Sequence, residues 1–222
     1  MSRGMLHMMK PALRAADGWA VQERTLSDVR PLIERHHYSG GCANTASLAA
    51  ALVDPAGEAV GAALWMAPAA GAAKWVAGVT GCDRAGVLTL SRMCFAPKTP
   101  RNAASFTLAR CLKILRRDPR WHVAVTYADP MEGHDGLVYQ SSGWTPAGEG
   151  GARFRWTDAD GVMRSSVCAG TLTVAEMRSR GWTRERCPAK PRFLTHISRR
   201  YRRAVLRGVA SLEAPKAAEV AS

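Results

Sequence analysis

The chain has 222 residues, of which 47% are hydrophobic, and carries a formal net charge of +13. Its length suits one sizeable core with some chain left over, and its longest Ala- and Gly-rich stretch, residues 59–73, is interrupted by Pro68. The composition therefore excludes a membrane-spanning segment, and the start MSRGMLHMMK lacks the apolar run of a signal peptide. Six scattered cysteines without a Cys-x-x-Cys pair argue against a zinc knuckle or a secreted disulfide framework, so we expect a cytoplasmic protein with no membrane partner.

The first third of the chain predicts antiparallel strands around one helix. Residues 19–25 alternate in hydrophobicity as a strand does, and residues 27–37 have helical spacing after Ser27, a candidate N-cap. Residues 47–53 and 58–66 are apolar strands, and the sequence DPAGE between them suits a hairpin turn.

The middle of the chain predicts a strand, a helix and a second strand. Residues 87–95 form an apolar run, residues 102–116 repeat apolar side chains every three or four positions, and residues 121–129 form another apolar run. Two such strands joined by a helix are expected to be parallel neighbours. With the flanking hairpins they predict an α/β fold with a mixed, partly antiparallel central sheet flanked by helices.

The last part of the chain has weaker patterns. A short helix over about 135–141 and strands near 152–156 and 163–169 complete the expected domain, which we place at residues 18–170. Residues 171–207 are expected to form a basic C-terminal extension, and residues 208–222 a frayed tail.

The positive charge is concentrated near the C-terminus. Residues 178–207 contain eleven Arg or Lys residues against one acid, Glu185, which gives this segment a net charge of +10. Clustered arginines interleaved with Trp182, Phe193 and Tyr201 favour a surface that contacts the phosphates of double-stranded DNA. The alternative is a solvated basic tail. The candidate DNA contacts fall in the run SRRYRR and are Arg199, Arg200, Arg202 and Arg203.

The start of the central helix is a candidate phosphate site. Asn102 is a suitable N-cap, and the small Ala103, Ala104 and Ser105 leave room for a ligand near the unpaired backbone N–H groups. Those groups and the helix dipole attract anions, and Arg101 and the Ser105 hydroxyl add a charge and a donor. The alternative is an ordinary capped helix.

Three residues near the ends of the central strands are candidates for chemistry. Arg92 lies in an otherwise apolar strand and must face an edge or pair with a carboxylate such as Asp129, so a structural ion pair and a catalytic role are both open. Asp129 ends the second strand and could orient or deprotonate an attacking amine. Tyr139, on the short helix, could donate a proton or could be a core tyrosine.

The order of these elements resembles the GNAT-type N-acyltransferase superfamily. Tyr139, Gly143 and Trp144 match its Tyr-x-x-x-Gly-aromatic signature, which implies a helix start that cradles the pyrophosphate of acetyl-CoA and a tyrosine that protonates the departing thiolate. The sequence KTPRNAA replaces the Gly-rich loop that is usual in the superfamily.

Three motifs narrow the resemblance. RHHYSGG, LSRMCFAPKTPRNAASFTLARCL and YADPMEGHDGLVYQSSGW, in this order over roughly residues 30–150, resemble phage Mom-like DNA-modification proteins. The resemblance implies transfer of an acyl-derived, carbamoylmethyl or acetamido-type group to N6 of adenine in DNA, in the cytoplasm of the host bacterium, which shields phage DNA from restriction. Carried over by position, it implies site roles for Arg92, Ser105, Asp129 and Tyr139, with His37 and Tyr38 on the substrate side.

Other functions stay open at this point. His36, His37 and His134 invite a metal site, but their spacing matches no helical or facial metal motif. An acyltransferase for a small amine or a protein lysine would not need the basic segment, and a DNA-binding module without activity would fit the missing Gly-rich loop.

Overall fold

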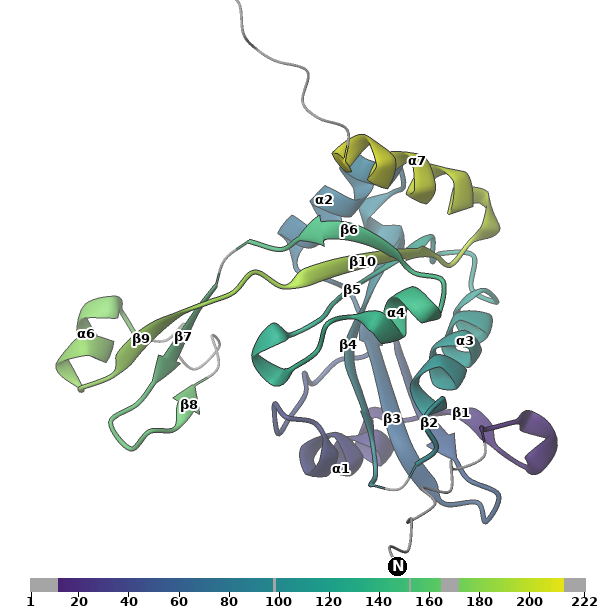
Figure 1. The fold of residues 1–222 in the computed structure, drawn as a ribbon, viewed down its shortest axis with the longest axis horizontal. Helices are drawn as coiled ribbons and strands as arrows, with labels where there is room; N and C mark the ends of the chain where they lie inside the picture. Colours follow the sequence, from purple (N-terminus) through teal and green to yellow (C-terminus); the bar gives the residue numbers. More distant parts are fainter. Residues whose placement is uncertain (1–11, 98, 152, 165–171, 214–222) are drawn as a thin grey trace, which may run out of the picture. The chain divides into compact units, whose positions relative to one another are not determined.

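The computed structural model describes residues 12–97, 99–151, 153–164 and 172–213, and Figure 1 shows their elements. These residues form two compact units. The first contains the described parts of 1–126, 137–147 and 193–222, and the second contains 127–136 and the described parts of 148–192.

The main sheet has seven strands in the order β1-β2-β3-β4-β5-β10-β6. Strands β1 to β4 are antiparallel to their neighbours, and β4 is parallel to β5. The predicted α/β fold class with a mixed sheet is therefore confirmed. The strand bounds are β1 Ala20–Arg24, β2 Leu48–Val53, β3 Ala59–Met66, β4 Val87–Phe95, β5 Val123–Tyr127, β6 Thr145–Glu149 and β10 Pro191–His196.

Helices cover both faces of this sheet (Figure 1). One face packs against α1, which contacts β2, β3 and β4, and α3 contacts β1 and β2 from the other side. Two further helices, α2 and α7, pack against each other. The bounds are α1 Leu26–His36, α2 Ala70–Thr80, α3 Ala103–Leu115, α4 Leu137–Ser141 and α7 Arg202–Glu213, with 3-10 turns η1 Ala15–Asp17, η2 Arg84–Gly86, η3 Pro130–Glu132 and η4 Arg199–Tyr201.

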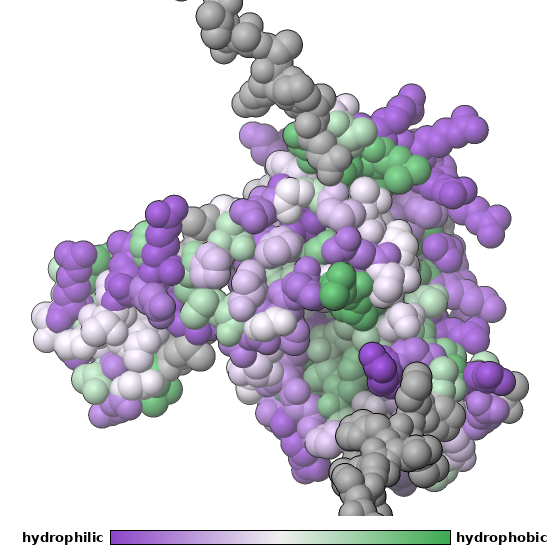
Figure 2. Space-filling view, viewed as in Figure 1, coloured by the Kyte–Doolittle hydropathy of each residue, from purple (hydrophilic) through white to green (hydrophobic). Residues whose placement is uncertain are grey.

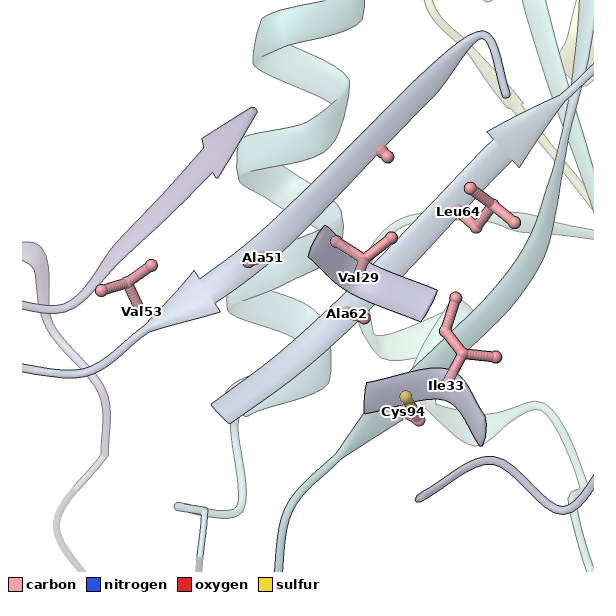
Figure 3. Close-up of a cluster of buried hydrophobic side chains, with 8 residues drawn as sticks. Val29, Ile33, Ala51, Val53, Ala62, Leu64 and Cys94 are labelled. Carbon is pink, nitrogen blue, oxygen red and sulfur yellow. The ribbon is translucent and has the colours of Figure 1, made fainter. Parts of the chain in front are cut away.

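The core explains why β2 is apolar at every position. Its residues Ala49, Ala51 and Val53 face α1, where they meet Val29 and Ile33 (Figure 3). Leu52, on the opposite face, packs with Ala103 of α3. A strand that is covered on both faces buries all of its side chains, so the alternating pattern of a half-exposed strand is lost. No helix among the described residues is long and apolar enough to cross a membrane.

The cap of α1 differs from the prediction by two residues. Thr25, not Ser27, is the N-cap: its hydroxyl accepts from the N–H of Asp28, and the Asp28 carboxylate accepts from the N–H of Thr25. Either hydroxyl residue fits the sequence pattern, and the reciprocal pair with Asp28 selects Thr25.

The C-terminal region is not an appended extension, which corrects the predicted boundary at residue 171. Strand β10 lies inside the main sheet, between β5 and β6, and α7 continues through residues 208–213 of the expected tail. Phe193 and Tyr201 are buried core residues rather than exposed stacking groups. Gly208 makes the close contact with α2 possible, because a Cβ there would lie 2.1 Å from the carbonyl oxygen of Val79.

The second unit contains a three-stranded sheet in the order β8-β7-β9, with helix α6 (Val174–Ser179). The strands are β7 Arg153–Thr157, β8 Met163–Arg164 and β9 Thr183–Cys187. Trp156 and Met177 form its small core, against which Trp182 packs. Most of the predicted strand 163–169 lies outside the described residues, and β6, β9, β10, α2, α6 and α7 were not predicted as elements.

Candidate functional site

The main sheet changes its pairing in the middle of β4. Adjacent residues of β3 lie opposite Leu90 and Arg92, so Ser91 is an extra residue that forms a bulge. On the other side of β4, the pairs with β5 run only over residues 87–89 and 123–125 in the described chain. The later part of β4 therefore keeps β3 as its strand neighbour and leaves one backbone edge without a strand partner. Bulges of this kind end strand pairing and re-aim side chains beside active sites.

Tyr139 lies beside the last residues of β5. Its hydroxyl is hydrogen-bonded to Thr126, whose Oγ1 also donates to the Leu90 carbonyl oxygen at 3.3 Å. The Tyr139 ring packs against Phe193, with centroids 5.3 Å apart, and Trp144, with centroids 5.7 Å apart. Burial raises the pKa of Tyr139, and the bond with Thr126 opposes this shift only in part. The phenol therefore keeps its proton at neutral pH and can donate it.

Arg92 is held by backbone carbonyl groups rather than by a carboxylate. Its Nε donates to the Gly41 carbonyl oxygen at 2.9 Å, and a terminal nitrogen donates to the Ser91 carbonyl oxygen at 2.7 Å. An ion pair between Arg92 and Asp129 was one of the expected alternatives, but the partners of Arg92 are backbone carbonyl groups. These bonds compensate the cost of a half-buried guanidinium and tie β4 to the loop that follows α1.

The same loop carries His37. The Gly41 carbonyl oxygen also accepts from the Ser39 hydroxyl at 3.0 Å, and the Ser39 backbone N–H donates to His37 Nδ1 at 3.1 Å. Because Nδ1 is an acceptor, the neutral imidazole carries its proton on Nε2. Tyr38 is 49% exposed, and its ring centroid lies 4.3 Å from that of His37. The structure thus links the predicted residues His37 and Tyr38 to Arg92 through Ser39 and Gly41.

The start of α3 differs from the prediction in its side chains. Asn102 does not cap the helix: its amide accepts from the Leu13 N–H at 2.7 Å and donates to the Leu13 carbonyl oxygen. Ala103 is buried, and the Ser105 hydroxyl donates to the Asn102 carbonyl oxygen at 3.1 Å. The sequence pattern could not reveal that the N-terminal segment uses this amide.

The backbone at the start of α3 still has free donors. The N–H of Ala103 donates to Pro100, whereas the N–H groups of Ala104 and Ser105 have no acceptor among the described residues. Arg101 is exposed beside them. Three of the five predicted phosphate contacts therefore remain suited to bind an anion. These are the backbone N–H groups of Ala104 and Ser105 and the side chain of Arg101.

Asp129 belongs to the second unit and is 5% exposed. Its carboxylate forms an ion pair with Lys190 and accepts a hydrogen bond from the N–H of Met131 at 3.2 Å. Lys190 is not among the residues that the sequence pattern marks. The pairing gives the Asp129 carboxylate a structural partner within the second unit. The signal for Lys190 is weak, because it is one of many cations in the basic segment.

The described residues do not bring metal ligands together. No group of three or more His, Cys, Asp or Glu side chains among them is placed to hold a metal ion, so the side chains of His36, His37 and His134 do not fit that interpretation.

The four predicted DNA-contacting arginines lie on two elements. Arg199 and Arg200 are in η4, and Arg202 and Arg203 begin α7; all four are exposed. The hydrophobic residues of the same segment, Tyr201, Val205 and Val209, are buried and fix the arginines on the surface. In Figure 2, hydrophilic residues project along the side of the molecule that carries α3 and around α7.

Comparisons with known structures give N-acetyltransferases. A mutant of the spermidine N-acetyltransferase from Vibrio cholerae is 9% identical with a TM-score of 0.49, covering 84% of this chain and 98% of its own. The ribosomal-protein alanine N-acetyltransferase from Escherichia coli is 12% identical with a TM-score of 0.48, covering 81% and 94%. A GNAT family N-acetyltransferase from Escherichia coli, in complex with CoA, is 15% identical with a TM-score of 0.42, covering 63% and 73%.

Sequence comparisons give a family. No curated protein sequence matches the chain. The model of the Mom protein family matches residues 18–206, which include the bulged strand, α3, Tyr139 and the arginine-rich turn. The chain belongs to the Mom protein family.

Proposed function

We propose that this protein is a transferase that uses acyl-CoA to modify the N6 amino group of adenine in double-stranded DNA. The observation that carries the proposal is the parting of β4 from β5 beside Tyr139, a phenol that burial keeps protonated. The finer product, a carbamoylmethyl or acetamido-type group that protects phage DNA from restriction, rests on the resemblance of the motifs to Mom-like proteins.

The acyl donor is proposed to lie between the start of α3 and the free edge of β4. The N–H groups of Ala104 and Ser105 and the Arg101 guanidinium are suited to the CoA pyrophosphate. The part of β4 that follows its pairs with β5 is proposed to offer backbone groups to the two amide groups of the pantetheine arm, as a strand edge does to an extended peptide. The arm can thus be held without the Gly-rich loop of the superfamily.

Tyr139 is proposed as the general acid. When the amine attacks the thioester carbonyl carbon, the carbon–sulfur bond breaks, the nitrogen is left bonded to the acyl carbon as an amide, and the sulfur leaves as a thiolate, which takes the phenolic proton. This step yields the acetamido-type product; a carbamoylmethyl group, bonded through its CH2 carbon, would need a different bond-forming step. A proton donor at this point contributes roughly 10²- to 10⁴-fold to the rate. The attacking nitrogen loses its proton to a base, for which Asp129, the carboxylate that the motif match implies, is our candidate.

His37, Tyr38 and Arg92 are proposed to contact the substrate. The exposed Tyr38 ring is suited to stack on a base that has left the duplex, and the His37 Nε2–H is suited to donate to a ring nitrogen. Arg92 positions their loop through Gly41.

The test uses the purified full chain, duplex DNA and acetyl-CoA labelled with carbon-13. We expect labelled carbon in the deoxyadenosine fraction after digestion to nucleosides, and an acetyl-CoA-dependent rise in melting temperature that Ser105→Trp removes by filling the approach to the N–H groups. A melting shift without label in DNA, but with label in polyamines or lysine peptides, would favour a small-amine or protein acyltransferase. DNA binding with neither the shift nor the label would favour a module without activity.

A further inference from the structure

We propose that a cavity between the C-terminal end of α3 and η4 is a binding pocket for one nucleotide unit of the DNA backbone. The cavity, of about 560 Å³, is here called the arginine pocket. Its lining includes Arg116, Trp121, His122, Arg199, Arg200 and Tyr201. All of them belong to the first compact unit.

The walls of the arginine pocket are fixed by backbone hydrogen bonds. The Arg116 Nε donates to the Ile197 carbonyl oxygen at 3.1 Å. The N–H groups of Ile197 and Ser198 both donate to the His122 carbonyl oxygen, at 2.9 and 3.1 Å. The end of α3, the residue before β5 and the turn after β10 therefore form one connected frame, which presents the guanidinium groups from a preorganised surface.

The floor of the pocket is aromatic. The His122 ring stacks on Tyr201, with centroids 4.8 Å apart, and Tyr201 is only 8% exposed. Gly86 makes room for this ring, since a Cβ at that position would lie 2.3 Å from a carbon of His122. The two rings support η4 and thereby hold Arg199 and Arg200 at the rim.

The charge of the pocket is not neutralised by the protein. Within the described part of the chain, no carboxylate lies within 4.0 Å of Arg116, Arg199 or Arg200. The acid in the lining, Asp118, is bound to Arg120 at 2.6 Å. Three guanidinium groups around one concave surface match the oxygens of a phosphate group, which they can bind in a bidentate manner.

His196 independently reports the positive field of this region. Burial is the largest cause of the lowered pKa of His196, and the charges of Arg116, Arg202 and Arg199 lower this pKa further. Cations from the end of α3, from η4 and from the start of α7 therefore act on one point of the first unit. Of these cations, Arg116 and Arg199 line the arginine pocket, so an anion bound there relieves the repulsion between them.

The size and the aromatic wall favour a nucleotide over a simple anion. Trp121 is partly exposed in the lining, and the Arg120 guanidinium lies 5.2 Å from the centroid of its ring. In a duplex the bases stay stacked on one another, so the partly exposed Trp121 is suited to pack on the deoxyribose while the arginines hold the adjacent phosphate. A nucleotide unit supplies both groups, whereas inorganic phosphate supplies one.

The arginine pocket lies apart from the proposed pyrophosphate site at the start of α3. Arg116 follows the last residue of α3, and the free N–H groups lie at its first turn, so the thirteen residues of the helix place the two sites about 20 Å apart. The inference rests on the proposed action on DNA, and it gives the pocket a role in DNA binding rather than in catalysis.

The test measures the affinity of the full chain for a short fluorescent duplex. We expect Arg116→Ala to weaken binding about tenfold and Arg199→Gln with Arg200→Gln to weaken it by up to about a hundredfold, as lost charged hydrogen bonds do. The slope of log affinity against log salt should flatten by about 0.9 for each phosphate released. The control is Arg117→Ala, which removes the same charge from an exposed neighbour that faces Glu23 at 4.0 Å and does not line the pocket. We expect it to change affinity less than about twofold, as exposed ion pairs do.

The outcomes separate the pocket from the proposed function. Equal losses in Arg116→Ala and Arg117→Ala would overturn the pocket in favour of diffuse attraction, and displacement of DNA by equimolar deoxynucleoside monophosphate would overturn DNA as the source of the nucleotide. The pocket variants should keep the acetyl-CoA melting shift, because none of the altered residues belongs to the proposed pyrophosphate site. If the wild type modifies no DNA yet binds it through the pocket, the proposed function fails and the pocket stands.

Discussion

The Nε atom of Arg92 donates a hydrogen bond to the carbonyl oxygen of Gly41 at 2.9 Å, across a sequence separation of 51 residues. That carbonyl oxygen also accepts from Ser39, whose N–H holds the His37 ring. An arginine that looks like a buried charge in the sequence therefore fastens the loop of His37 and Tyr38 to the bulged strand.

Arg92→Lys should reduce the rate of DNA modification by at least about tenfold, because an ammonium group lacks the planar fork that reaches two carbonyl groups at once. The fold should persist, since the charge and the aliphatic stem remain. Faster hydrogen exchange at the Ser39 and Gly40 N–H groups would report the loosened loop. Arg30→Lys is the control, because Arg30 bonds to the same loop, through Asn44 at 3.0 Å, but from α1 rather than from β4. A wild-type rate with unchanged exchange in Arg92→Lys would show that the bond positions nothing.

Tyr139 should ionise at a higher pH than an ordinary tyrosine. Its pKa is raised by burial, so the tyrosinate absorbance lost in Tyr139→Phe should appear above the ordinary value of about 10. As the pH rises, Tyr139 ionises in the unfolded chain before it does so in the folded protein. Its contribution therefore makes the free energy of unfolding decrease above about pH 10. Tyr139→Phe should also lower the turnover rate by about 10²-fold or more, with unchanged acetyl-CoA affinity. A titration at or below the ordinary value would contradict the buried phenol.

The Asp129–Lys190 pair allows stability and catalysis to be separated. Asp129→Asn and Lys190→Met should each destabilise the fold by up to about 3 kcal/mol, because each leaves one partner without its counter-charge, and the partly exposed lysine moderates the cost. The double variant should recover most of that loss. Its activity should stay near zero if Asp129 is the base, whereas recovery of activity together with stability, measured by denaturant unfolding and nucleoside analysis, would assign the pair to structure.

Gly208 and Gly78 should respond in opposite directions to alanine. Gly208→Ala should destabilise the protein by about 1–3 kcal/mol, because the new Cβ meets the backbone oxygen of Val79, which cannot move aside easily. Gly78, also inside a helix, has open space where a Cβ would lie, so Gly78→Ala should stabilise by about 0.5–1 kcal/mol through helix propensity. Thermal unfolding of both variants measures the difference. A stabilised Gly208→Ala would contradict the close packing of α7 on α2.

The sequence predicts the central unit well because its signals are local. Apolar periodicity is sufficient for β4, α3 and β5, and their parallel pairing follows from the connection. The helix α2 escapes prediction because its Ala- and Gly-rich sequence has little contrast between faces, and β10 escapes because arginines and a lysine surround it in the sequence. Tertiary pairing with β5 and β6, rather than local propensity, makes it a central strand.

In the candidate site, too, the features with a local sequence signal are predicted and those that depend on contacts between distant segments are not. Tyr139 follows from a motif with fixed spacing, but its partner Thr126 and the roles of Ser39 and Gly41 depend on contacts between distant segments. The unexpected use of the Asn102 amide by Leu13 has the same cause. The arginine pocket needs residues from the end of α3 and from η4, and only Arg199 and Arg200 stand out in the charge pattern.

Mass spectrometry of nucleosides from the DNA of cells that express the protein tests the central claim most directly, since every co-substrate is present there. The account predicts a deoxyadenosine derivative with added mass on N6 in cells that express the wild type, and its absence in cells that express equal amounts of folded Tyr139→Phe. Identical nucleoside profiles for the two, with only unmodified deoxyadenosine, would contradict DNA adenine modification by this protein.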